Sequence, residues 1–130
     1  MSDKFKTILG SYHLRGVDFY PTYIENNGMT WKICNFVHIW NNYRALSKKR
    51  SVIDGTYVDD RFILKKISLD EDVLDKIPLN ERLVFRLNED PKYLYHEFVI
   101  SALSSAGLTG FRFVRVSDWG PHSAFNIEAG

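Results

Sequence analysis

The sequence is poor in residues that form covalent or metal cross-links. Cys34 is the single cysteine among 130 residues, which excludes an internal disulfide and a multi-cysteine zinc site. Long apolar segments are also missing. The longest run, Ile33 to Trp40, contains polar residues and is far shorter than the roughly 20 residues needed to span a bilayer. Stability must therefore come from packing of apolar side chains, which the hydrophobic content of 45% allows.

Signs of export and of several domains are absent as well. Met1 to Lys6 are polar and are not followed by the apolar segment of a signal peptide, so we expect a cytoplasmic protein without a membrane partner. No internal repeat or Pro/Gly/Ser-rich linker is visible, and the length suits one domain over residues 1–130. Glycine, proline and asparagine interrupt residues 1–28. We expect that part to be irregular or peripheral, with a turn at Asn27-Gly28.

The best-marked catalytic and ligand-binding motifs are missing too. The sequence has no GxxxxGK[ST], GxGxxG, GxSxG or HExxH motif, and its histidines do not follow a zinc-ligand spacing. The acidic runs Asp59-Asp60 and Asp70 to Asp72 do not match the ligand alternation of a calcium loop. We therefore expect no enzymatic activity, no metal ion and no cofactor.

Among the features that are present, the clearest secondary-structure pattern runs from Glu81 to Val116. Residues 83–87 alternate as in a half-buried strand. From Lys92 to Ala106 apolar residues recur at helical spacing, and Gly107 follows where a helix C-terminus favours glycine. Residues 111–116 alternate again. This pattern predicts a strand, a helix and a strand that close the domain.

Upstream segments add further strands and a short helix. Met29 to Trp40 is rich in aromatic and β-branched residues, which is typical of a buried strand, and Arg61 to Ser68 is also expected to be a strand. Acidic residues from Asp70 open a short helix that ends before Pro78. The sequence thus predicts an α+β domain. Its sheet is mixed or antiparallel, with one main helix, about Lys92 to Ala106, packed on it.

Charge is distributed unevenly along the chain. Residues 1–53 carry eight basic and three acidic residues, whereas residues 54–90 carry six basic and ten acidic ones. The basic stretch Arg44 to Arg50, near Trp40 and Tyr43, has the mixture of charge and aromatic rings that binds nucleic acid. The sequence pI of about 7.9 is lower than that of a dedicated nucleic-acid domain. Nucleic-acid binding is therefore an alternative, not the expected role.

A second alternative is a small enzymatic or ligand-binding domain. His96 and Glu97 are adjacent in the expected helix, so they point in different directions. They would need a further element, or His38, to complete an acid/base site.

Several segments of the chain, taken in order, resemble a family of bacterial immunity proteins once catalogued as a domain of unknown function. The similarity covers roughly Trp40 to Val116, and it rests on Trp40-Asn41-Asn42-Tyr43, Ser51, Leu64 to Glu71, Val84 to Leu87 and Ala106 to Phe113. Proteins of this family occur beside polymorphic toxins that bacteria deliver by contact. The resemblance implies a cytosolic protein that binds a cognate toxin domain and neutralises it, without chemistry of its own.

The matched positions have the character of core and turn residues, so the resemblance itself implies no binding residue, and we expect the toxin contacts outside Glu81 to Val116, including Trp119. Aromatic side chains flanked by segregated charge are suited to anchoring a protein partner. Trp119 follows the last expected strand and is the aromatic residue that the predicted core needs least. The candidate partner-binding residues are Trp40, Tyr43, Asp70, Glu71, Asp72 and Trp119.

Overall fold

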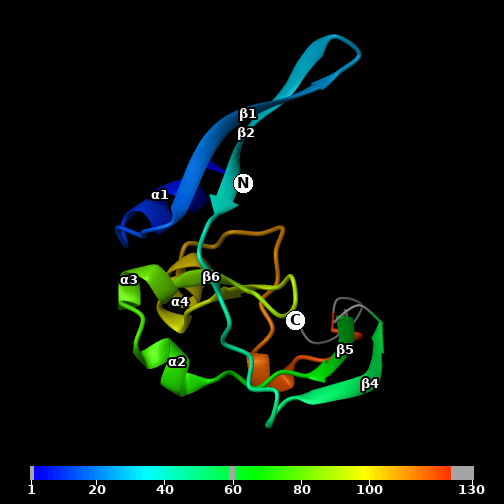
Figure 1. The fold of residues 1–130 in the computed structure, drawn as a ribbon. Coiled ribbons are helices and arrows are strands. Elements are labelled where there is room, and N and C mark those ends of the chain that lie inside the picture. Colours follow the sequence, from blue (N-terminus) through cyan, green and yellow to red (C-terminus); the bar gives the residue numbers. More distant parts are fainter. Residues whose placement is uncertain (1, 59–60, 124–130) are drawn as a thin grey trace.

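The computed structural model describes residues 2–58 and 61–123, and it has the α+β architecture that the sequence predicts (Figure 1). The elements follow in the order α1 (Asp3–Gly10), β1 (Val17–Asn26), β2 (Met29–Ile39), β3 (Asn42–Tyr43), β4 (Val52–Val58), β5 (Arg61–Lys66), α2 (Glu71–Asp75), α3 (Leu79–Arg82), β6 (Val84–Leu87), β7 (Tyr93–Tyr95), α4 (Glu97–Ser105) and the 3-10 helix η1 (Val116–Asp118).

The strands of the described residues form three small sheets. In the central sheet, β6 pairs in parallel with β3 and in antiparallel fashion with β7. The β1–β2 hairpin and the β4–β5 hairpin are separate two-stranded sheets. Figure 1 shows the β1–β2 hairpin extending away from the rest of the molecule at one end, with β4 and β5 at the other.

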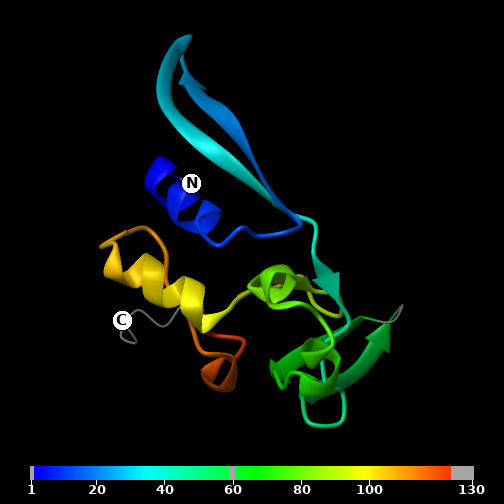
Figure 2. The same ribbon diagram turned by 90° about the vertical axis from the view of Figure 1, so that its left-hand side faces the viewer.

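Strand β6 separates two apolar cores because its side chains alternate between two faces. Val84 packs with Leu9 of α1 and with Leu103 of α4, all of them nearly inaccessible to solvent. Phe85 and Leu87 belong to the other core, which is completed by buried residues of the segments around β3, β5 and α2. Helices α1 and α4 therefore lie side by side on one side of β6 (Figure 2).

The main helix is shorter than predicted, and the strand expected after it does not form. Residues 93–95 form β7 against β6, so α4 begins only at Glu97. Residues 111–115 pair with no strand among the residues that the structure describes, where β3 and β7 occupy both sides of β6. Phe113 instead packs its ring against Tyr95, with the centroids 5.3 Å apart. The strand–helix–strand interpretation is therefore wrong at its second strand.

Residues 1–28 were expected to be irregular or peripheral, and the structure shows that they are not irregular. Ser2 caps α1 by accepting a hydrogen bond from the Phe5 N–H, at 3.2 Å, and Phe5 and Leu9 bury one side of that helix. Strand β1 then pairs along its whole length with β2. The turn at Asn27-Gly28 is confirmed, since both residues have positive φ angles of 53° and 77°.

Two tyrosines beside the cores make stability sensitive to high pH. Burial, and secondarily the Tyr93 phenol, raise the pKa of Tyr95, and burial followed by the Glu81 charge raises the pKa of Tyr43. A raised pKa in the folded state means that stability is complete below the unfolded value of about 10 and falls as pH rises beyond it. We expect Tyr95→Phe to reduce this fall in urea unfolding measured from neutral to alkaline pH. The exposed Tyr23→Phe should leave it unchanged, and an equal change in both variants would contradict the prediction.

Candidate binding surface

The register of the β1–β2 hairpin places one group of aromatic side chains on a single face. Asp18 lies opposite His38 and Tyr20 opposite Phe36, and residues two apart in a strand share a face. Trp40 follows His38 by two residues and continues the row. We call this the outer aromatic face, and it consists of Asp18, Tyr20, Phe36, His38 and Trp40.

The opposite face of the hairpin packs on the body of the protein. Val17, Phe19 and Ile39 lie against the core formed by α1 and α4. The buried Asn35 donates a hydrogen bond from its Nδ2 to Asp3 Oδ1 of α1, at 2.8 Å. The hairpin is thus held by one face, which leaves the outer aromatic face directed to solvent.

Large apolar area is exposed on this outer aromatic face. The exposed fractions are 49% for Tyr20, 57% for Phe36 and 60% for Trp40. The solvent side of a two-faced strand ordinarily carries polar residues, and neighbouring exposed aromatics mark interaction sites. Met29–Trp40 was expected to be a buried strand. The strand is confirmed, but its burial is wrong for Phe36 and Trp40.

Trp40 is held in one orientation despite its exposure. Its Nε1 donates a hydrogen bond to Asp18 Oδ2 at 2.7 Å, and its ring lies 3.9 Å from the His38 ring. The remaining ring surface faces solvent. A rigid, oriented aromatic side chain loses little conformational entropy on binding, which is a property of residues that dominate interface energies.

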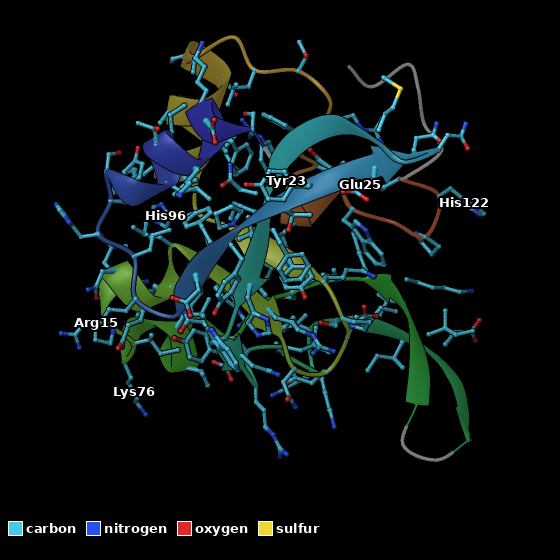
Figure 3. The ribbon with its side chains drawn as sticks, turned by 90° about the horizontal axis from the view of Figure 1, so that it is seen from above. Arg15, Tyr23, Glu25, Lys76, His96 and His122 are labelled. Carbon is cyan, nitrogen blue, oxygen red and sulfur yellow. The ribbon has the colours of Figure 1, made fainter. Side chains whose placement is uncertain are left out.

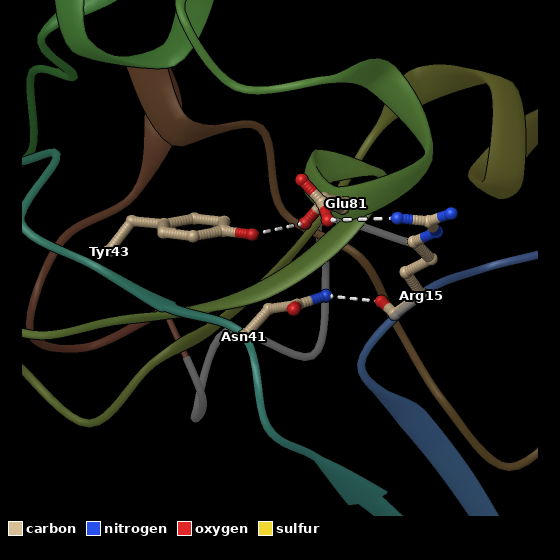
Figure 4. A network of polar contacts seen from close by, with 4 residues as sticks. All are labelled: Arg15, Asn41, Tyr43 and Glu81. Carbon is tan, nitrogen blue, oxygen red and sulfur yellow. Dashed lines mark hydrogen bonds and ion pairs between the residues drawn. The ribbon is translucent and has the colours of Figure 1, made fainter.

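A polar network fixes the hairpin to the body (Figure 4). Asn41 Nδ2 donates hydrogen bonds to the carbonyl of Arg15, at 2.6 Å, and to that of Val84, at 3.3 Å. The Tyr43 hydroxyl donates to the Glu81 carbonyl at 2.8 Å, and the Glu81 carboxylate lies 4.0 Å from the Arg15 guanidinium. The outer aromatic face therefore has a defined position relative to the core.

Of the six predicted partner-binding residues, Tyr43 and Trp119 pack against the core. The Tyr43 ring lies 5.4 Å from that of Phe85. Trp119 packs against the core formed around Leu87, and Lys92 Nζ sits 4.5 Å from the centre of its ring. The interpretation of Trp119 as the aromatic residue that the core needs least is wrong. It arose because the sequence does not show that the segment after α4 folds back over β6.

The acidic residues 70–72 lie at the start of α2. Asp70 is its N-cap, and its side chain accepts hydrogen bonds from the N–H groups of Asp72 and Val73. Glu71 and Asp72 are exposed in the first turn, where negative charge favours a helix. Of these three acidic residues, Glu71 and Asp72 are therefore the two whose carboxylates do not cap the helix.

Comparing Asp70 with Asp72 measures how much the capping role of Asp70 stabilises the protein. Asp70→Ala removes the cap and should lower the free energy of unfolding by about 1 kcal/mol. Asp72→Ala leaves the cap intact and should change it by less than about 0.5 kcal/mol. Urea unfolding of both variants measures the difference. Equal losses would show that Asp70 does not stabilise α2.

The basic stretch Arg44 to Arg50 is only partly a charged surface. Ala45 and Leu46 are buried, and the Arg50 guanidinium donates a hydrogen bond to the Leu69 carbonyl at 2.9 Å. Arg44, Lys48 and Lys49 are exposed. This segment contains no aromatic ring, and Tyr43 packs its ring on Phe85, which removes one of the stacking platforms that the nucleic-acid alternative requires.

The histidines do not converge on an acid/base site. His96 caps α4, with its Nδ1 accepting a hydrogen bond from the Phe98 N–H at 3.1 Å, and Glu97 lies exposed in the first turn. His38 stacks on Trp40 instead. Figure 3 shows His96 and His122 on opposite sides of the molecule. Within residues 2–58 and 61–123, no three His, Cys, Asp or Glu side chains are grouped as metal ligands.

Tyr20 and Phe36 were missed by the sequence interpretation, because β1 was not recognised as a strand. A signal was available. Asn27-Gly28 favours a two-residue hairpin turn, and pairing the flanking segments around it brings aromatic residues onto one face. None of the helices in the described part of the chain has the length and hydropathy of a membrane span. Comparison of the chain with protein-family models and with curated protein sequences gives no match.

Proposed function

We propose that the protein is a non-catalytic binding protein that neutralises a cognate bacterial toxin domain by protein–protein contact. The observation that carries the proposal is the outer aromatic face, on which three large aromatic side chains are 49% to 60% exposed on an anchored hairpin. The resemblance of Trp40 to Val116 to immunity proteins supports the choice of a toxin as partner.

The chemistry of the face suits a protein partner. Tyrosine, tryptophan and phenylalanine are enriched at the centres of protein interfaces, while charged residues are depleted there. Asp18, the charged residue of this face, is already hydrogen-bonded to Trp40. A partner can therefore cover the face without leaving that carboxylate unpaired, which would otherwise be costly.

Inhibition by coverage requires affinity and no reacting group. A toxin domain would be neutralised when the hairpin lies over its active site or holds it at a neighbouring surface. Either geometry uses the same aromatic anchors. His96 and Asp70 cap helices away from the outer aromatic face, and this role leaves those contacts undisturbed.

The direct test is co-purification with the product of the neighbouring toxin-like gene, combined with rescue of growth in cells that express it. We expect a stable complex and restored growth with the wild-type protein. Ser104→Ala, which changes an exposed residue of α4 outside the candidate partner-binding residues, serves as a control and should rescue fully. Absence of both complex and rescue would refute the proposal.

A further inference from the structure

Three polar side chains form a row across the central sheet. Asn42 of β3 is the register partner of Arg86 in β6, and Arg86 is in turn the partner of Tyr93 in β7. Paired residues of neighbouring strands point to the same face of a sheet, and the strands lie about 4.8 Å apart. The three side chains are therefore neighbours. We call Asn42, Arg86 and Tyr93 the polar row.

The polar row lies beside the core formed by α1 and α4, and solvent reaches it. Val84 and Tyr95, the next pair along β6 and β7, contact that core. Arg86 and Tyr93 are two residues away from them and share their face. The influence of the Tyr93 phenol on the pKa of Tyr95 agrees with this arrangement. Asn42 and Tyr93 are exposed and Arg86 is partly buried, so a ligand can approach all three.

The charge of Arg86 is not balanced by any side chain within residues 2–58 and 61–123. Its guanidinium makes no ion pair or hydrogen bond there, and its Nε is shielded from water without a partner. Glu89, beyond the end of β6, also has a buried Oε2 without a partner, but the two residues do not pair. A shielded, charged donor without an acceptor costs free energy. Part of the desolvation that anion binding requires has therefore already occurred on folding.

We propose that the polar row binds a carboxylate group, with Arg86 as the charged donor and the Tyr93 hydroxyl and Asn42 amide as flanking donors. All three side chains can donate hydrogen bonds, and the row contains no acidic residue. A guanidinium matches the planar carboxylate with two parallel hydrogen bonds. Its single positive charge balances one carboxylate, whereas a phosphate group carries close to two negative charges at neutral pH.

The polar row is separate from the outer aromatic face. It belongs to β3, β6 and β7, and the outer aromatic face belongs to the β1–β2 hairpin and Trp40. Carboxylate binding therefore does not depend on the proposed toxin. The carboxylate can come from a small organic acid, or from the side chain or C-terminus of a peptide.

A titration of the full chain with sodium acetate, followed by two-dimensional amide NMR, tests the proposal. Sodium chloride at equal ionic strength is the reference. We expect saturable, millimolar shifts at the amides of Arg86 and Tyr93 with acetate and none with chloride. Acetate should also raise the melting temperature, because it binds the folded state. Absence of saturable shifts overturns the site, and inorganic phosphate that binds as tightly as acetate overturns the choice of a carboxylate.

Variants separate recognition by Arg86 from a general effect of charge. Arg86→Gln keeps hydrogen-bond donors but loses the charge, and it should weaken acetate binding roughly tenfold or more and abolish the rise in melting temperature. Arg86→Lys keeps the charge without the fork and should bind with intermediate affinity. Arg44→Gln removes the same charge from an exposed position just after β3 and should bind like the wild type.

The variants are expected to fold, since the Arg86 guanidinium has no partner to lose among the described residues. The dispersion of the amide spectrum checks this in each titration. Unchanged acetate binding by folded Arg86→Gln, or equal weakening by Arg44→Gln, overturns the proposal.

A peptide titration distinguishes the two sources of the carboxylate. Triglycine with a free C-terminal carboxylate is compared with triglycine amide and with acetate. Tighter binding of the free peptide than of acetate supports a peptide as the source, and equal affinity supports a small organic acid. An amide that binds as tightly as the free peptide overturns carboxylate recognition altogether.

Discussion

Gly16→Ala is expected to lower the free energy of unfolding by about 2 to 5 kcal/mol, a large part of the stability of a domain this size. Two costs combine. Gly16 has a φ angle of +73°, in the left-handed region that residues with a Cβ avoid. A Cβ at this position would also overlap the side-chain amide of Asn41, which is held by the carbonyls of Arg15 and Val84.

Gly28→Ala is the matched control for this prediction. Gly28 has a similar φ angle of +77°, but a Cβ there meets no atom within 4 Å. The Gly28→Ala substitution should therefore lower the free energy of unfolding only by the backbone strain, about 1 to 2 kcal/mol. Urea unfolding of both variants measures the difference, which reports the close approach of Gly16 to Asn41. If both variants lose the same stability, the Asn41 amide can move aside and the junction is looser than the structure indicates.

Trp40→Ala is expected to weaken binding of the proposed toxin partner roughly 30-fold or more, because a truncated hot-spot residue costs about 2 kcal/mol or above. The indole is exposed, oriented by Asp18 and stacked on His38. Its removal should leave the fold intact, since Trp40 is not part of either core. Titration calorimetry with the purified toxin domain measures the loss, and far-UV circular dichroism checks the fold.

Trp119→Ala provides the contrasting variant. Trp119 is partly buried and packs on the core around Leu87 and beneath Lys92, so its truncation should lower the free energy of unfolding by less than the about 3 to 5 kcal/mol that a fully buried aromatic side chain loses. Affinity for the toxin should change little in the protein that remains folded. Unchanged binding by Trp40→Ala would refute the role of the outer aromatic face.

The elements that sequence patterns predicted correctly are those whose signals are local. The alternation around Phe85 identified β6, the acids from Asp70 identified α2, and Gly107, with a φ angle of +68°, follows the end of α4. The errors concern pairing. Tyr93 to Tyr95 fit a helical stripe but pair with β6, and residues 111–115 alternate like a strand but have no partner in the described sheets.

The candidate surface could be predicted only in part. Trp40 was identified from its place beside basic residues and within the family-like order of segments. Tyr20 and Phe36 were not, because they become neighbours only when β1 and β2 pair with Tyr20 opposite Phe36. A shift of that register by one residue would turn these side chains toward the core. Packing of Val17 and Ile39 against α1 and α4 opposes such a shift.

The sequence by itself determined the α+β class, the turn at Asn27-Gly28, the positions of β6 and α2, and the end of the main helix. These follow from the side-chain period, capping and backbone preference of neighbouring residues. Only the tertiary structure decided that the hairpin is held by one face, that Trp119 joins a core and that three aromatic side chains remain outside. Those outcomes depend on which distant segments pack together, since burial of a side chain is set by its neighbours in space.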